Sequence, residues 1–268
     1  MNRLMAGARR LGAAWIERIY PPVCLLCGAP GHEGMDLCGP CAAELPRPSG
    51  PCPRCGLPLM GDASHLCGHC LSHPPAFDRT WAALTYVWPV DDLVGRFKFQ
   101  GRLNQGRLLG ELMARELGPR VTRPDCVIPV PLHAHRLRER GFNQALELAR
   151  PLSRALNCPL EILAVRRVRA TPPQQTLSAK HRQRNLRGAF HVAEGFAPAH
   201  VALVDDVMTT GSTLDELAGV LKTRGVQRVD VWVLARVPDP ARGHPEPDNP
   251  VQSRQTPPPR TSCCSKRP

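Results

Sequence analysis

Short apolar runs alternate with amphipathic stretches between residues 76 and 238, and this alternation predicts an α/β domain. The apolar runs are four to seven residues long, which is ordinary strand length. Each is separated from the next by turn residues or by a helical pattern. The expected strands are Trp81–Val87, Cys126–Val130, Val201–Val204 and Val229–Leu234, with weaker candidates at Ile162–Val165 and Ala189–Val192.

Apolar residues at helical spacing lie between these runs and predict three helices, which cover residues 108–117, 145–152 and 214–221. The first ends at Gly118-Pro119, a helix stop signal. The second contains Pro151, which we expect to kink or split it. Strands that alternate with helices indicate a parallel sheet built from βαβ units.

The segments on either side of this domain differ from it in composition. Residues 1–20 carry apolar residues at roughly helical spacing and predict a short amphipathic helix. Residues 21–75 are rich in Cys, Pro and Gly. Residues 239–268 are polar and rich in Pro, so we expect them to be disordered, because few apolar side chains are present to offset the entropy of ordering.

No apolar run is long enough to predict a transmembrane helix. Charged residues interrupt the N-terminal segment, which is therefore a poor signal peptide. We expect a cytoplasmic protein in which the cysteines stay reduced.

Basic residues are in excess along the chain. There are 35 Lys and Arg against 23 Asp and Glu, a formal net charge of +12. This balance favours polyanionic partners such as nucleic acid, pyrophosphate or sugar phosphates, although background composition alone could produce it. Twelve Lys and Arg against three Asp and Glu lie between His133 and Arg187, so most of the excess is concentrated there. That concentration favours a functional basic face.

Eight of the twelve cysteines form four C-x-x-C pairs separated by ten, ten and eleven residues. One such turn brings two thiolates within reach of a metal ion, and two turns complete a tetrahedral site. Zinc is favoured over redox-active dithiols or an iron–sulfur cluster, and its role would be structural. The pairs can combine sequentially or in a cross-braced order. The predicted ligands are Cys24, Cys27, Cys38, Cys41, Cys52, Cys55, Cys67 and Cys70.

The stretch VALVDDVMTTGSTLDEL, residues 201–217, carries the strongest signal for a ligand site. A buried strand is expected to end at Val204, which places Asp205 and Asp206 where open parallel sheets bind ligands. A loop of small residues follows, and a helix should begin near Thr213, where Thr213 and Glu216 make a capping box. The carboxylates suit vicinal sugar hydroxyls.

The loop itself is suited to phosphate. Free N–H groups and the positive end of the helix dipole point toward it, and hydroxyl groups add donors. It is not a P-loop, because G-x-x-x-x-G-K is missing. A phosphate beside a diol indicates a ribose 5-phosphate unit. The predicted phosphate-binding residues are Thr209, Thr210, Gly211, Ser212 and Thr213.

This stretch resembles the phosphoribosyl pyrophosphate (PRPP) motif of type I phosphoribosyltransferases. Further segments, FKFQGR, VIPVPLHAHRLRERGFNQA, TPPQQTLSAKHRQRNLRGAF and LAR, together with the cysteine-rich head, resemble the ComF/GntX family, bacterial proteins linked to competence for DNA uptake. The resemblance covers roughly residues 20–238. It implies a type I phosphoribosyltransferase-like domain at 76–238, preceded by a double zinc ribbon at 21–75.

The resemblance also implies roles for the basic segments. The loop 131–144 would contact pyrophosphate, and a long loop at 168–187 would close over the site. Mg²⁺ would accompany PRPP, and Asp205 and Asp206 would hold the ribose during displacement of pyrophosphate. The residues implied for pyrophosphate and the closing loop are Arg136, Arg138, Arg140, Arg169, Lys180 and Arg184.

Three functions remain open at this level. The first is phosphoribosyl transfer to an unknown acceptor. The second is a non-catalytic protein with a sensory or vestigial PRPP site. The third is a protein that binds single-stranded DNA or DNA-processing partners through its basic face and zinc ribbons. The complete PRPP motif favours the first two, and the basic excess favours the third.

Overall fold

The computed structural model describes residues 21–59, 65–169 and 188–238. The predicted N-terminal helix, the predicted disordered tail and most of the predicted closing loop lie outside these residues. Contacts between Cα atoms divide the chain into two units, of which residues 21–45 and 46–238 are the described parts. The second half of the cysteine-rich region therefore groups with the α/β body.

The first unit is a small cysteine-rich fold. An isolated β-bridge joins Val23 to Pro30 around the first C-x-x-C turn, and α2 (Gly39–Ala43) begins directly after Cys38. Apolar burial is limited to a few side chains besides the cysteines, among them Met35 and Leu37. So small a core indicates that folding of this unit depends on a bound metal.

The second unit is built on a four-stranded sheet in the order β1-β6-β5-β2, and every neighbouring pair is parallel. The prediction of a parallel sheet is therefore confirmed. All four strong strand candidates become strands of this sheet, which are β1 (Arg79–Thr85), β2 (Cys126–Pro129), β5 (His200–Met208) and β6 (Arg228–Arg236).

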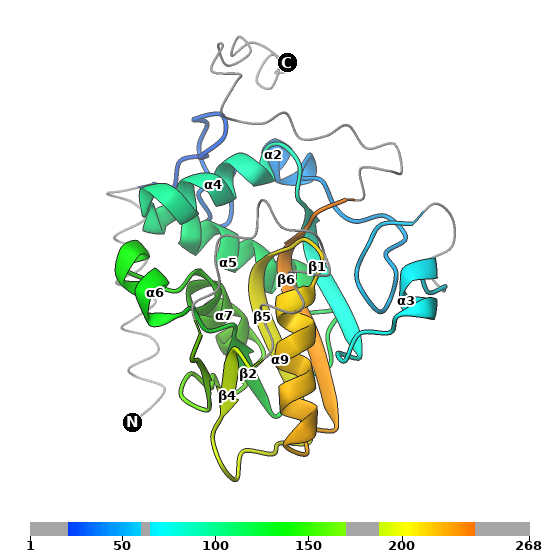
Figure 1. Ribbon diagram of the computed structural model, residues 1–268. Coiled ribbons are helices and arrows are strands. Elements are labelled where there is room, and N and C mark those ends of the chain that lie inside the picture. Colours follow the sequence, from blue (N-terminus) through cyan, green and yellow to red (C-terminus); the bar gives the residue numbers. More distant parts are fainter. Residues whose placement is uncertain (1–20, 60–64, 170–187, 239–268) are drawn as a thin grey trace, which may run out of the picture. The chain divides into compact units, whose positions relative to one another are not determined.

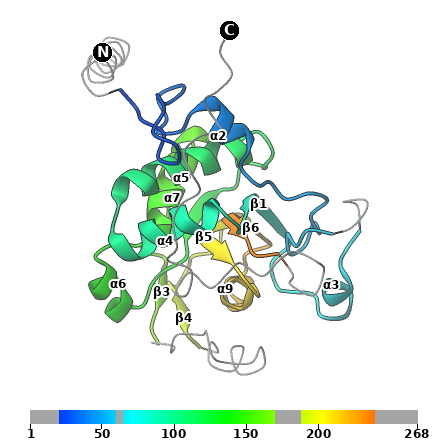
Figure 2. The same ribbon diagram turned by 90° about the horizontal axis from the view of Figure 1, so that it is seen from above.

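Helices cover both faces of this sheet. Helices α5 and α7 pack on each other and lie on one face, whereas α9 lies on the other (Figures 1 and 2). The helices of the second unit are α3 (Gly68–Ser72), α4 (Val90–Gln100), α5 (Leu103–Leu117), α6 (Ala134–Arg140), α7 (Gln144–Ala155) and α9 (Ser212–Thr223). None of the helices in the described residues is long and apolar enough to cross a membrane.

Two expectations about local structure need correction. Pro151 was expected to kink or split its helix, but α7 runs as one helix through Pro151, so the split does not occur. A Cβ on Gly110 of α5 would lie 2.9 Å from the Pro151 ring. The weaker strand candidates form β3 (Val165–Arg167) and β4 (Phe190–Val192), which pair antiparallel in a separate two-stranded sheet. Each of these two strands is three residues long, and they pair with each other rather than with the main sheet.

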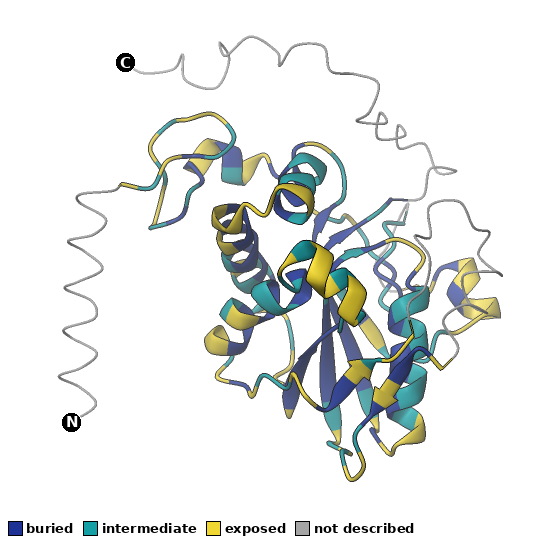
Figure 3. Cartoon of the chain, turned by 60° about the vertical axis from the view of Figure 1, so that its left-hand side comes forward, coloured by how far each residue is buried: buried dark blue, intermediate teal, exposed yellow. Residues whose placement is uncertain are grey.

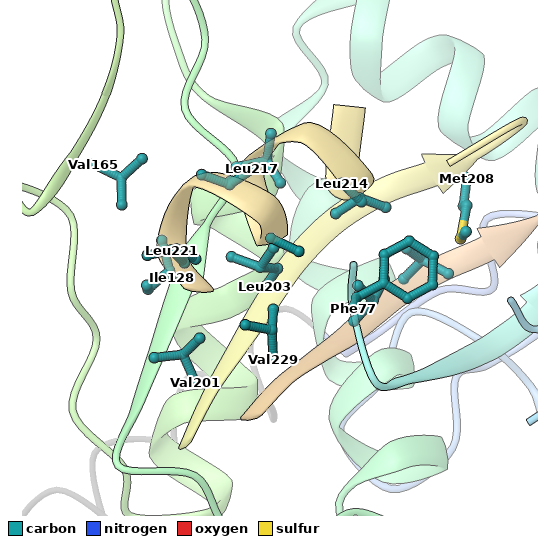
Figure 4. Close-up of a cluster of buried hydrophobic side chains, with 14 of the residues drawn as sticks. Phe77, Ile128, Val165, Val201, Leu203, Met208, Leu214, Leu217, Leu221 and Val229 are labelled. Carbon is teal, nitrogen blue, oxygen red and sulfur yellow. The ribbon is translucent and has the colours of Figure 1, made fainter. Parts of the chain in front are cut away.

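The core between the sheet and α9 is continuous with the second half of the cysteine-rich region. Leu214, Leu217 and Leu221 of α9 pack over Val201 and Leu203 of β5 (Figure 4). The same buried cluster includes Phe77, Met208 and the four cysteines between residues 52 and 70. Figure 3 shows the strands of the main sheet buried along most of their length, while α6 is largely exposed.

Candidate functional site

The eight cysteines of the head form two separate clusters. The pairs combine sequentially, so the cross-braced alternative is excluded. Within each cluster the potential ligand atoms lie within 4.8 Å of one another. The clusters are Cys24, Cys27, Cys38 and Cys41 in the first unit, and Cys52, Cys55, Cys67 and Cys70 in the second.

The spacing of the sulfur atoms fits a zinc ion. The Sγ atoms of Cys27 and Cys38 are 3.6 Å apart, and those of Cys55 and Cys67 are 3.7 Å apart. A tetrahedron with Zn–S bonds of about 2.3 Å has edges of about 3.8 Å. Burial, followed by neighbouring cysteines, raises the pKa of both Cys41 and Cys70, so a nearby cation is needed for all four thiols to ionise. The clusters are consistent with structural zinc.

The aspartate pair lies within strand β5 rather than after it. The strand was expected to end at Val204, but its pairing with β6 continues to Met208 opposite Arg236. Backbone pairing does not require apolar side chains, so the ladder passes through both acidic residues. Successive side chains of a strand point to opposite faces, so Asp205 and Asp206 meet different neighbours.

A lysine and an arginine from distant elements balance the two carboxylates. Lys98 Nζ of α4 lies 3.0 Å from Asp206 Oδ2, and both side chains are largely buried. Burial and the charge of Asp206 raise the pKa of Asp205 to about 7, an effect that Lys98 and Arg167 oppose. Burial lowers the pKa of Arg167, while the charge of Asp205 raises it. Holding the Asp205 and Asp206 carboxylates close together and away from solvent costs free energy, and such arrangements are typical of functional sites.

The loop after β5 combines a left-handed glycine with the start of a helix. Gly211 has a φ of +80°, and a Cβ there would lie 2.5 Å from Met208 Cε, so only glycine fits without rearrangement. The Thr210 and Ser212 hydroxyl oxygens are 2.9 Å apart. Helix α9 begins at Ser212, and the first N–H groups of a helix lack intrahelical partners. These donors are directed at the loop.

The predicted capping box at the start of α9 is wrong. The N-cap is Gly211 rather than Thr213, and glycine has no side chain with which to cap. Glu216 Oε1 instead accepts a hydrogen bond from the backbone N of Gly188 at 3.0 Å. The helix start is consequently left without a side-chain cap.

The arginines predicted for pyrophosphate are only partly brought to the site. Arg136 of α6 lies close enough to lower the pKa of Arg167, behind burial as the main cause. Arg140 donates to Gln144 Oε1 at 3.1 Å and lies over the Phe99 ring at 5.7 Å. Arg138 and Arg169 are exposed. Lys180 and Arg184 lie outside the described residues.

Three residues near the aspartates and the loop received no role from sequence reasoning. Lys98 lies in FKFQGR and Arg236 in LAR, two segments that carried the family resemblance, so a signal existed. Arg167 adjoins the expected closing loop. Arg236 is buried at the end of β6, where its guanidinium donates to the carbonyls of Met208 and Thr209.

Two domain families match the chain in the order that this geometry suggests. The double zinc ribbon domain matches residues 15–71, and the phosphoribosyl transferase domain matches residues 143–258. The DNA utilization protein YhgH of Escherichia coli K12 is 40% identical over 225 residues, which cover 81% of this chain and 97% of that protein. The chain belongs to the ComF/GntX family. Its fold is that of type I phosphoribosyltransferases with a zinc-ribbon head.

Other members of the family are named for competence. Competence protein F of Haemophilus influenzae is 39% identical, over 80% of this chain and 96% of that protein. Competence protein ComFC of Streptococcus pneumoniae is 25% identical, over 80% and 99%. A purine phosphoribosyltransferase of Pyrococcus horikoshii is 20% identical, with a TM-score of 0.29, over 60% of this chain and 84% of that one. The family assignment rests on the curated relatives and the domain families.

Proposed function

We propose that the second unit binds PRPP at the carboxyl end of β5 and transfers its phosphoribosyl group to an acceptor. The observation that carries the proposal is the juxtaposition of Asp205 and Asp206 with the Gly211 turn and the uncapped start of α9. Carboxylates accept hydrogen bonds from the ribose hydroxyls, and the turn donates them to the 5-phosphate. One strand–loop–helix unit thus offers both groups that a ribose phosphate needs.

The phosphate would sit where the turn already directs its donors. The backbone N–H groups at the start of α9 carry the positive end of the helix dipole. Hydroxyl groups of Thr209, Thr210, Ser212 and Thr213 add donors that can rotate toward phosphate oxygens. The turn contains no lysine, so the 5-phosphate is recognised mainly by neutral donors.

Positive charge would come from outside the turn. Lys98 faces Asp206, and Arg136 and Arg167 lie near one another on the Asp205 side. When no ligand is bound, these cations balance the negative charge of Asp205 and Asp206. Once PRPP binds, they would face its pyrophosphate. Arg138, Arg140 and Arg169 would add to the proposed basic surface for the leaving group. Lys180 and Arg184 stay predictions for it, since they lie outside the described residues.

In the proposed reaction the bond between the anomeric carbon and pyrophosphate breaks as a bond to the acceptor nucleophile forms. Asp205 and Asp206 would orient the ribose and favour positive charge at the anomeric carbon. The basic residues would stabilise the departing pyrophosphate. Mg²⁺ would supply further charge stabilisation, and the carboxylate oxygens of Asp205 and Asp206 are donors that fit such a hard cation.

Calorimetric titration of PRPP with Mg²⁺ tests this site. The wild-type chain should bind, and the double variant Asp205→Asn/Asp206→Asn should not, with zinc content unchanged at about two ions per chain. Asp125→Asn is a matched control, because Asp125 accepts a hydrogen bond from the backbone N of His200 at the opposite end of β5. The control should bind PRPP normally. A wild-type chain that fails to bind PRPP contradicts the proposal.

Transfer requires a separate measurement. Pyrophosphate release should depend on both PRPP and an added nucleophile, with nucleobases and amines as the first acceptors to be tried. Release without any acceptor would indicate hydrolysis. Binding without any release, across all acceptors, would favour a sensory role over a transferase.

A second candidate function is contact with single-stranded DNA during DNA uptake. Two large aromatic side chains, Trp88 and Phe99, are 71% and 76% exposed, and Arg140 lies over the Phe99 ring. Exposed aromatic rings beside basic residues are the usual platform for single-stranded nucleic acid. The names of the relatives, DNA utilization protein and competence protein, favour the same process.

A labelled oligonucleotide titrated at two salt concentrations tests the DNA candidate. Affinity should fall as salt rises, because phosphate contacts release counterions. Phe99→Ala should weaken binding by about tenfold at both salt concentrations. An oligonucleotide affinity that changes neither with salt concentration nor in Phe99→Ala would contradict this candidate.

A further inference from the structure

A single buried guanidinium joins the second cysteine cluster to the loop that follows β5. Arg236 is 6% exposed at the end of β6. Its Nε donates to the carbonyl of Cys55 at 2.9 Å, and its Nη1 donates to the carbonyls of Met208 at 3.0 Å and Thr209 at 2.5 Å. The Arg236 side chain therefore links the backbone of Cys55, a proposed zinc ligand, to that of Thr209, the first residue of the proposed phosphate loop.

The charge of this guanidinium is balanced in an unusual way. In the described part of the chain no carboxylate pairs with Arg236, and the second cluster adjoins its guanidinium, because Nε donates to the carbonyl of Cys55. Four thiolates outweigh the charge of one Zn²⁺, so an occupied cluster carries net negative charge. A buried cation is costly without a counter-charge, so an occupied cluster would help to hold Arg236 in place, together with the carbonyls that accept its hydrogen bonds.

Two further contacts tie the same region to the start of α9. The backbone N of Ala76, which follows the second cluster, donates to Asp215 Oδ1 in the first turn of α9 at 2.7 Å. Phe77 belongs to the same buried cluster as Met208, and its ring would lie 3.8 Å from a Cβ on Gly211 (Figure 4). The loop is therefore held at both of its ends by residues attached to the second cluster.

We propose that the metal of the second cluster controls ligand binding at the proposed PRPP site, with Arg236 as the positioning residue that transmits its presence. Loss of this metal leaves the guanidinium without its counter-charge and frees the Met208 and Thr209 carbonyls, so the loop no longer presents its donors together. The first cluster belongs to the other unit and has no part in this control. The inference rests on the proposed PRPP site.

The internal repeat of the head supplies a matched experiment. Cys27→Ser and Cys55→Ser remove corresponding ligands of the two clusters, and each should lower the zinc content by about one ion per chain. PRPP affinity, measured by calorimetry with Mg²⁺, should fall at least about tenfold in Cys55→Ser and stay within about twofold of wild type in Cys27→Ser. Equal effects of the two variants, or no effect of Cys55→Ser, would overturn the proposal.

Variants of Arg236 keep all eight cysteines and cover the case in which Cys55→Ser does not fold. Arg236→Met removes the charge and every donor, whereas Arg236→Lys keeps the charge but lacks the planar guanidinium whose separate nitrogens reach the carbonyls of Cys55, Met208, Thr209 and Val237. PRPP affinity should fall in both variants, with Arg236→Lys recovering part of the loss, while zinc content stays near wild type. Unchanged PRPP affinity in both Arg236 variants would sink the idea.

Hydrogen exchange separates failure of this inference from failure of the PRPP site itself. Amides of residues 209–214 should exchange faster in Cys55→Ser and Arg236→Met than in wild type or Cys27→Ser, with no PRPP present. If wild type does not bind PRPP but the loop still responds, the PRPP assignment is wrong and the coupling stands. If wild type binds PRPP and the loop does not respond, the coupling is wrong.

Discussion

The two cysteine clusters share one local design and differ in what surrounds them. In each, the backbone N of the first cysteine donates to a carbonyl five residues on, Cys24 to Ala29 and Cys52 to Leu57. In each, a short helix, α2 or α3, begins after the third cysteine. The first cluster lies in a small unit with little other core, whereas the second lies within the buried cluster beneath α9.

This difference indicates that two four-cysteine clusters with the same ligands can have different structural roles. A metal site in a unit with few apolar residues mainly supplies folding energy for that unit. A metal site within the core of a larger unit also fixes the residues packed against it. Arg236, Ala76 and Phe77 make the second cluster part of the environment of the loop after β5.

Removal of zinc by a chelator should show the largest difference between the two clusters. Cys27 of the first cluster is exposed, whereas all four cysteines of the second are buried. A chelator can reach the first metal directly, but it can reach the second only after local opening of the core. We expect zinc release to occur in two phases of similar amplitude, with rates that differ by at least about tenfold. A colorimetric zinc indicator measures both phases.

The assignment of the phases is checked with the paired variants. Cys27→Ser should abolish the fast phase and leave the slow one, and Cys55→Ser should do the reverse. A single phase in wild type, or loss of the slow phase in Cys27→Ser, would contradict the structural difference between the clusters.

The comparison also shows which features a sequence can reveal. Three local signals were informative. Cysteine spacing predicted metal sites in the head, and the alternation of apolar runs with helical patterns predicted the parallel sheet. The switch from apolar to acidic residues after Val204 predicted the position of the loop. The exact ends of strands could not be predicted as well. Strand β5, for example, continues through Asp205 and Asp206 because it pairs with β6. Sequential pairing of the cysteines could be favoured but not settled from spacing alone.

Contacts between distant segments carried no such signal. The hydrogen bond from Arg236 to Cys55 joins residues 181 positions apart. Lys98 of α4 and Asp206 of β5 are 108 positions apart in the chain, yet their charged groups lie 3.0 Å from each other. No periodicity or motif in one chain encodes these pairs, since they depend on which strands become neighbours in the sheet. The residues could be singled out by resemblance, but their partners could not.

A change of pH should affect the second unit through Asp205. Its folded-state pKa, about 7, is above the usual 3.8 because burial and Asp206 disfavour the carboxylate. The folded state therefore binds this proton more tightly than the unfolded state, and stability is lost as pH rises toward 7. Asp205→Asn is neutral throughout and avoids that loss.

Urea unfolding of wild type and Asp205→Asn at about pH 5.5 and about pH 8.5 measures this contribution. The stability of the variant relative to wild type should be about 1 to 2 kcal/mol greater at the higher pH. The restriction to this range keeps zinc bound to the thiolates. A difference that does not change with pH, or that shrinks as pH rises, would contradict the raised pKa of Asp205.

Two equivalent glycines allow a finer test of the comparison. Gly28 and Gly56 each follow the second cysteine of their cluster, with φ of +77° and +69°. A Cβ on Gly28 would meet nothing within 4 Å, whereas one on Gly56 would lie 2.9 Å from Thr80 Cγ2 and 3.9 Å from Arg236 Cδ. Alanine costs about 1 to 2 kcal/mol at either site from backbone strain, and at Gly56 about 1 kcal/mol more from crowding.

Thermal unfolding of the two variants measures the stability difference. The structural comparison predicts more than stability, because only the Gly56→Ala methyl group would crowd Thr80 Cγ2, at 2.9 Å, and contact Arg236 Cδ, at 3.9 Å. Weaker PRPP binding in Gly56→Ala, with normal binding in Gly28→Ala, would match that prediction. Equal destabilisation in the two variants would show that the surroundings of Gly56 yield without cost.

The smallest expected effect concerns the hydroxyl that joins β1 to the second cluster. Thr80 is 4% exposed, and its Oγ1 donates to the carbonyl of Arg54, between two proposed zinc ligands, at 2.7 Å. Thr80→Val keeps the shape but leaves that carbonyl without its partner, which should cost about 1 kcal/mol of unfolding free energy. Thr85→Val is the control in the same strand, since the Thr85 hydroxyl makes no hydrogen bond within the described residues and is also buried. Chemical denaturation should show a loss for Thr80→Val and little change for Thr85→Val, because of these two hydroxyls only that of Thr80 donates to the backbone of the second cluster.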